Sequence, residues 1–66
     1  TYYMVTEESV DGFDLKDVVN ENGTVDKDYE ATVKDEEDVE HEYVGKSTGT
    51  IGEPATVMFK NGVGLA

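Results

Sequence analysis

The sequence predicts a small all-β protein, with an antiparallel sheet or partial barrel of about four to six short strands built from hairpins. Ten valines, four tyrosines and two phenylalanines, which all favour strands, occur in short clusters along the 66 residues. Asn-Gly and Asp-Gly pairs, which favour tight turns, separate several of these clusters. A chain of this length forms at most one domain, residues 1–66.

The first twenty residues contain one clear strand and one ambiguous segment. Residues 2–6 are rich in strand-forming side chains, and turn signals follow at residues 7–9 and 11–12. Residues 13–19 fit either a strand or a short helix with Asp14 as its cap. We slightly favour a strand, because a helix of barely two turns is marginal without packing.

The middle of the chain predicts a turn and then a long hairpin. Residues 20–23 end in Asn-Gly, which suits the two positive φ angles of a type I′ hairpin turn. Apolar and polar residues alternate in residues 25–34 and again in residues 38–43. The acidic residues 35–37 interrupt the alternation, which predicts a hairpin over residues 29–44 with an acidic tip.

Two registers of this hairpin are open. One brings the like-charged Glu30 and Glu42 face to face, which is destabilising. A shift of two residues removes that repulsion and places Lys34 opposite Glu40. The sequence does not decide between them.

The last third of the chain is neutral and rich in glycine. Residues 45–49 and 52–54 predict turns, and residues 55–60 predict a strand. An Asn-Gly pair at residues 61–62 predicts a second hairpin turn, followed by a very short strand at residues 63–66.

Charge narrows the classes of function. Sixteen acids face five lysines and no arginine, and the net charge is −11. Direct binding of nucleic acid needs a basic surface, and an anionic membrane also repels such a chain. No segment approaches the roughly 18 apolar residues of a membrane span. The chain has no cysteine, so neither a disulfide nor a thiolate metal site stabilises it.

Three motifs suggest a catalytic or binding site without completing one. A calcium loop of the EF-hand type would need acidic ligands where Val18 and Tyr29 stand. The GKST sequence at 45–48 resembles the end of a phosphate-binding loop, but Glu40 replaces the glycine needed five residues earlier. A lone histidine and two serines in so small a chain do not indicate a catalytic cleft. We expect no enzyme activity, no cofactor, no metal site and no small-molecule substrate.

The stretch KDEEDVEHEY, residues 34–43, holds the densest acidity and the only histidine. Its alternation places Asp38, Glu40 and Glu42 on one strand face, about 6.6 Å apart, so they do not converge on an ion. His41 points to the opposite, apolar face. We expect His41 to be packed or hydrogen-bonded, with a pH switch as the alternative.

The function that this composition favours is that of a non-enzymatic subunit of a larger assembly. A small core that neither a disulfide nor a metal stabilises gains stability when it packs on a partner. Examples are a virion or phage capsid or tail accessory protein and a surface-assembly subunit. The neutral tail either completes the core of the domain or docks on that partner, and the two roles are compatible. The candidate partner interface comprises Val57, Met58, Phe59, Val63 and Leu65. The candidate acidic contact surface comprises Asp35, Glu36, Glu37, Asp38, Glu40 and Glu42.

Two alternatives explain the acidity differently. An acidic mimic of nucleic acid could inhibit a basic protein, with association steered by charge. A surface adapted to high salt would need no partner at all. In each case the chain acts through a protein partner, through copies of itself or through solvent.

Overall fold

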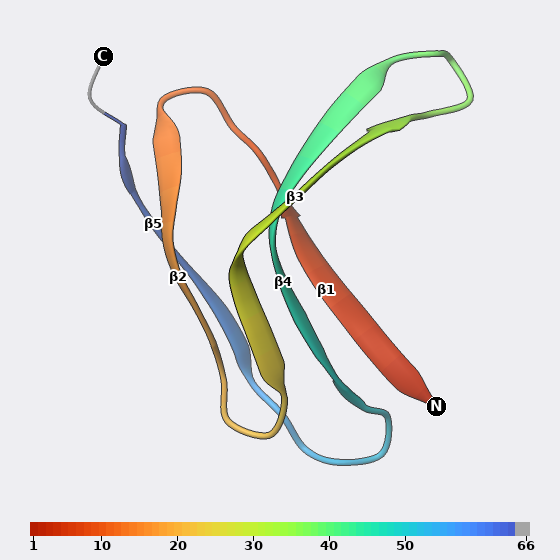
Figure 1. Ribbon diagram of the computed structural model, residues 1–66, viewed down its shortest axis with the longest axis vertical. Helices are drawn as coiled ribbons and strands as arrows, with labels where there is room; N and C mark the ends of the chain where they lie inside the picture. The colour runs from red at the N-terminus through yellow and green to blue at the C-terminus, as the bar shows by residue number, and fades with distance from the viewer. Residues whose placement is uncertain (65–66) are drawn as a thin grey trace.

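Five β-strands make up most of residues 1–64, the part of the chain that the computed structural model describes (Figure 1). They are β1 (Tyr2–Glu8), β2 (Phe13–Asn20), β3 (Thr24–Lys34), β4 (Glu40–Thr50) and β5 (Val57–Val63). Every pairing is antiparallel. The prediction of a small antiparallel all-β fold is confirmed, and residues 13–19 are strand rather than helix.

The strands divide between two small sheets. One has the order β1-β4-β3, with β4 in the middle, and the other pairs β2 with β5. Strand β2 lies against β3 and β4, so the two-stranded ribbon packs on the three-stranded sheet. Strands that neighbour one another in space are therefore often far apart in the chain.

The β3–β4 hairpin adopts the shifted register. Lys34 lies opposite Glu40, and Glu30 lies opposite Val44 instead of Glu42. The pairing thus exchanges a like-charge contact for an opposite-charge one. At the tip, the Asp35 carboxylate accepts the backbone N–H groups of residues 37 and 39 at 2.8 and 3.0 Å, which closes the acidic turn.

Several predicted turns are wrong because tertiary pairing overrides local preference. Residues 20–23 do turn, but they lead from β2 into the other sheet and form no hairpin. Residues 45–49 lie inside β4, and residues 61–62 lie inside β5 opposite β2. Residues 7 and 8 extend β1. The turns near residues 11–12 and 51–53 form as expected.

The two sheets meet at Gly45. This residue is extra in the pairing of β4 with β1, so it forms a bulge there, and its φ of 73° favours glycine. Opposite β3 the register also shifts at this point, because residues 27–29 of β3 lie against Gly45 alone. A Cβ there would collide with Leu15 and lie 3.1 Å from both Phe59 and Val18. Val18, only 3% exposed, is the one large apolar side chain among residues 1–64 that is buried. The apolar core is therefore a small cluster of Leu15, Val18 and Phe59 that packs against Gly45.

Polar groups complete the core beside this cluster. Ser47 is fully buried, and its hydroxyl donates to the Thr24 carbonyl at 3.1 Å. The Asn20 side-chain amide donates to Ser47 Oγ at 2.8 Å and to Tyr3 Oη at 2.7 Å. These bonds tie both sheets together, and no buried side-chain N or O atom within residues 1–64 lacks a partner.

Gly45→Ala should destabilise the fold by about 2–4 kcal/mol, because it adds backbone strain at positive φ to overpacking of the core. Gly52→Ala is the matched control: its φ is 106°, but a Cβ there meets nothing within 4 Å. Urea unfolding measures both variants, and an equal loss in the two would contradict the packing role of Gly45.

Candidate partner-binding site

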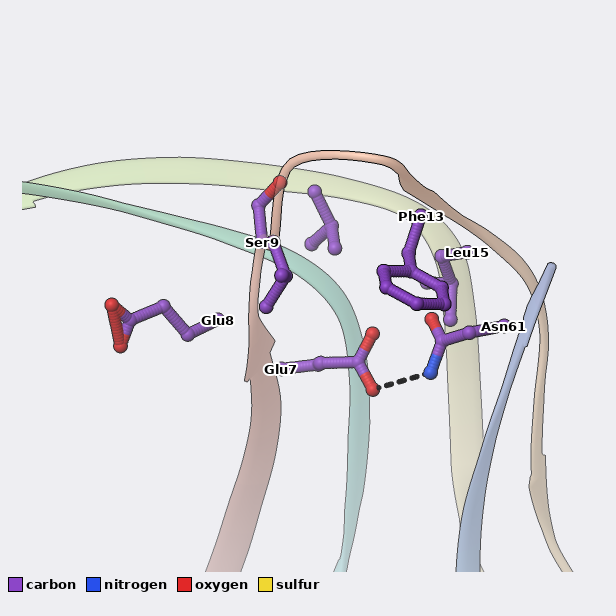
Figure 2. Close-up of a pocket in the computed structure, with 8 residues that line it drawn as sticks. Glu7, Glu8, Ser9, Phe13, Leu15 and Asn61 are labelled. Atoms are coloured by element: carbon purple, nitrogen blue, oxygen red, sulfur yellow. Dashed lines mark hydrogen bonds between the residues drawn. The ribbon is translucent and has the colours of Figure 1, made fainter. Parts of the chain in front are cut away.

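The two sheets separate beyond the core and leave a cavity of about 310 Å³ between them (Figure 2). Its apolar lining comes from Val10, Phe13, Leu15 and Val44. Strand β2 supplies Phe13 and Leu15, and the loop before it supplies Val10. Because the two sheets diverge here, Val10 and Phe13 stay exposed, whereas Leu15 is half-buried at Gly45.

The exposed fractions of the apolar side chains show that this end of the core is incompletely covered. Phe13 pairs with Val63 across the ribbon, yet the two residues are 55% and 73% exposed. Exposed apolar side chains that gather at one place mark a surface for contact with another molecule. The open end of the core is therefore the site best suited to receive an apolar group.

Carboxylates border the cavity. Glu7 accepts a hydrogen bond from the Asn61 side-chain amide at 3.0 Å, which links β1 to β5 across the opening. Glu8 also lines the cavity, and its carboxylate reaches away to His41. An apolar group with a neighbouring positive charge would match this combination of lining and border.

His41 holds two carboxylates from different parts of the chain. Its Nδ1 lies 3.0 Å from Glu8 Oε1, and its Nε2 lies 2.8 Å from Asp35 Oδ2. Ionised carboxylates only accept hydrogen bonds, so both ring nitrogens can donate only when the imidazole is protonated. The arrangement joins the end of β1 to the acidic hairpin tip.

The titration of this cluster follows from its geometry. The hydrogen bond with Asp35, and then that with Glu8, raises the pKa of His41 above its ordinary 6.5. The bond from His41, followed by that from the Val39 N–H, lowers the pKa of Asp35 below its ordinary 3.8. The expectation of a hydrogen-bonded His41 is confirmed, with partners in β1 and in the acidic tip.

The predicted partner interface occupies several environments. Val57 and Phe59 are half-buried, and Phe59 belongs to the core at Gly45. Met58 and Val63 are exposed. Leu65 lies outside the described residues. Phe59 therefore places part of the tail in the core of the domain, which is one of the two roles expected for the tail.

All six residues of the predicted acidic surface are exposed. Asp35 is the one bound to His41, and Asp38 lies 3.5 Å from the Lys34 ammonium. No group of three His, Asp or Glu side chains within residues 1–64 could hold a metal ion. No helix that could cross a membrane occurs in that same part of the chain.

Sequence reasoning missed the cavity and its border. Glu7 and Glu8 belong to a predicted turn, Val10 lies between two predicted turns, and Phe13 begins an ambiguous segment. Alternation in these places is too short to assign a face. Only the pairing of β2 with β5 brings Phe13 beside Val63. A lone phenylalanine after Asp-Gly was the single available signal.

No protein-family model, no curated protein and no solved structure matches this chain.

The His41 cluster should make stability depend on pH. His41 has a higher pKa in the folded state than in the unfolded state. Its contribution to the free energy of unfolding is therefore complete below pH 6.5 and is lost as the pH rises through the pKa of the folded state. The contribution of Asp35, whose folded pKa is lowered, is present above pH 3.8 and is lost as pH falls through its folded value. The stability difference between wild type and His41→Gln should therefore be largest between pH 3.8 and 6.5.

NMR titration of the single histidine provides a direct check. We expect a pKa above 6.5 that falls in Asp35→Asn and in Glu8→Gln. Glu36→Gln removes the same charge from the exposed tip and should change the value less. A wild-type value below 6.5 would contradict the arrangement.

Proposed function

We propose that this protein is a non-enzymatic structural subunit that packs into a larger assembly, such as a virion or phage capsid or tail, or a surface layer. The main support for the proposal is the small number of buried apolar side chains. Among residues 1–64 one large apolar side chain is buried, whereas exposed ones occur on every strand or beside it. Such a chain gains stability by covering those groups with a partner.

Surface area supports the same proposal. The chain exposes 5082 Å². A folded monomer of 7.2 kDa ordinarily exposes about 4,100 Å², so the excess is about 1,000 Å². Each partner in a stable protein interface buries about 800 Å². The excess is thus comparable to one interface of ordinary size.

Exposed apolar groups lie on both faces of the β2–β5 ribbon. Phe13 and Val63 pair at the open end, on the face that lines the cavity. Val19 and Met58 pair farther along and point to the opposite face, because their neighbours Val18 and Phe59 point to the core. This distribution favours a partner that covers the ribbon and inserts an apolar group into the cavity. The candidate docking surface therefore extends from the predicted tail onto β2 and the loop before it.

The acidic hairpin influences how partners approach. Its exposed carboxylates attract a basic surface and repel another acidic one, and salt weakens both effects. The inhibitor that mimics nucleic acid is the alternative in which this hairpin, and not the apolar ribbon, makes the main contact. Salt separates the two, because apolar docking persists where charge contacts are screened.

Association should stabilise the fold. We expect the urea unfolding midpoint to rise with protein concentration, because each tenfold step adds about 1.4 kcal/mol to the free energy of unfolding per mole of dimer above its Kd. Sedimentation and unfolding from nanomolar to millimolar protein, in 0.1 and 1 M KCl, measure this.

Phe13→Ser tests whether the open end of the core contributes to association. Because Phe13 is more than half exposed, the variant should weaken docking on the ribbon more than it weakens the monomer fold. A chain that stays a stable folded monomer at every concentration, with no dependence of the midpoint and no binding to another protein, would refute the proposal.

A further inference from the structure

Strand β1 forms an outer edge of the three-stranded sheet (Figure 1). Its first five residues, Tyr2–Thr6, carry no charge, no proline and no bulge. Strands β2, β3 and β5 all carry lysine, and two of them also carry acids. Natural proteins protect sheet edges with such charges, because a bare edge pairs with other strands. Within residues 1–64, this edge of β1 has no partner strand.

The hydrogen-bonding groups of this edge can be assigned. The Ile51 N–H donates to the Thr1 carbonyl at 2.9 Å, and Tyr2 lies opposite Thr50. In an antiparallel ladder this places Tyr2 in a pair that is not hydrogen-bonded to β4. The backbone N–H and C=O groups of Tyr2, Met4 and Thr6 therefore point away from β4, toward the open edge.

We propose that this edge pairs with β1 of a second copy of the chain, antiparallel and centred on Met4. The two three-stranded sheets then become one continuous sheet through the dimer. The inference rests on the proposed assembly function and names one of its contacts. It uses a surface distinct from the cavity between the sheets.

The register follows from the residues themselves. Centring on Met4 places Tyr2 opposite Thr6, so all outward-pointing backbone groups meet partners. On the other face Tyr3 lies opposite Val5, an aromatic and β-branched pair that favours sheets. A shift of two residues one way places Glu8 opposite Tyr2, and a shift the other way shortens the contact.

A second copy suits this edge better than a basic partner. No charge lies on Tyr2–Thr6, so a basic segment would find no carboxylate there to pair with. The side chains to be covered are apolar and exposed, with Tyr2 at 79% and Met4 at 60%. Residues 21–44 carry most of the negative charge and belong largely to the other strands.

The charge of each copy has a measurable consequence. Two chains of net charge −11 repel one another at a distance, although their contacting edges are neutral. Salt screens that repulsion. The dimer should therefore tighten as KCl rises from 0.05 to 1 M, whereas contact with a basic partner would weaken.

Met4→Lys tests the proposal, with Val33→Lys as the matched control. Both side chains are exposed, 60% and 52%, on edge strands of the same sheet, and both variants add one positive charge. Met4→Lys places two ammonium groups opposite each other and should weaken the dimer at least tenfold. Val33→Lys should leave the dimer unchanged or tighter, because it lowers the overall repulsion. Sedimentation equilibrium measures both, and circular dichroism checks the fold.

A cysteine at position 4 tests the register. The chain has no cysteine, so Met4→Cys introduces a single thiol. Opposed Cα atoms in a hydrogen-bonded pair lie about 5.5 Å apart, within reach of a disulfide. Mild oxidation should link Met4→Cys into dimers and leave Val33→Cys unlinked.

The outcomes separate this inference from the broader proposal. Association that Met4→Lys does not weaken, or a dimer in which Met4→Cys does not cross-link, overturns pairing through β1 and leaves the assembly function standing. A wild-type chain that is monomeric at every salt concentration but captures an extended segment of another protein at this edge also overturns self-pairing. A monomer with neither contact overturns both.

Discussion

The structure depends on the bulge at Gly45. This residue has no counterpart in β1, and its missing side chain lets Leu15, Val18 and Phe59 lie directly on β4. Without this contact the β2–β5 ribbon would lose its apolar packing on β4, and an isolated two-stranded ribbon is marginal in water. One glycine in the central strand therefore permits the apolar contact between the two sheets.

The contact at Gly45 is local, and that explains both the small core and its open end. Apolar side chains are covered where the ribbon contacts β4 at Gly45 and exposed where the two sheets diverge. The buried network of Ser47, Asn20 and Tyr3 stabilises the other side through hydrogen bonds. A chain of this construction links its stability to association, because a partner can supply the missing cover.

Charge is distributed so that the two ends of the molecule differ in character. The acidic hairpin tip extends away, and His41 holds two of the carboxylates that would otherwise repel each other. The first residues of β1 are neutral and present open backbone groups. Steering by charge and docking by strand or apolar contact can therefore act at separate surfaces.

The sequence by itself determined the all-β class, the β3–β4 hairpin with its acidic tip, and the face on which His41 lies. Those features follow from alternation and turn chemistry within short segments. Only the tertiary structure decided which strands share a sheet, that Gly45 forms a bulge instead of a turn, and what His41 binds. His41 and Glu8 are 33 positions apart, and Glu7 and Asn61 are 54 apart. Local patterns do not encode such pairings, because they depend on how whole strands pack.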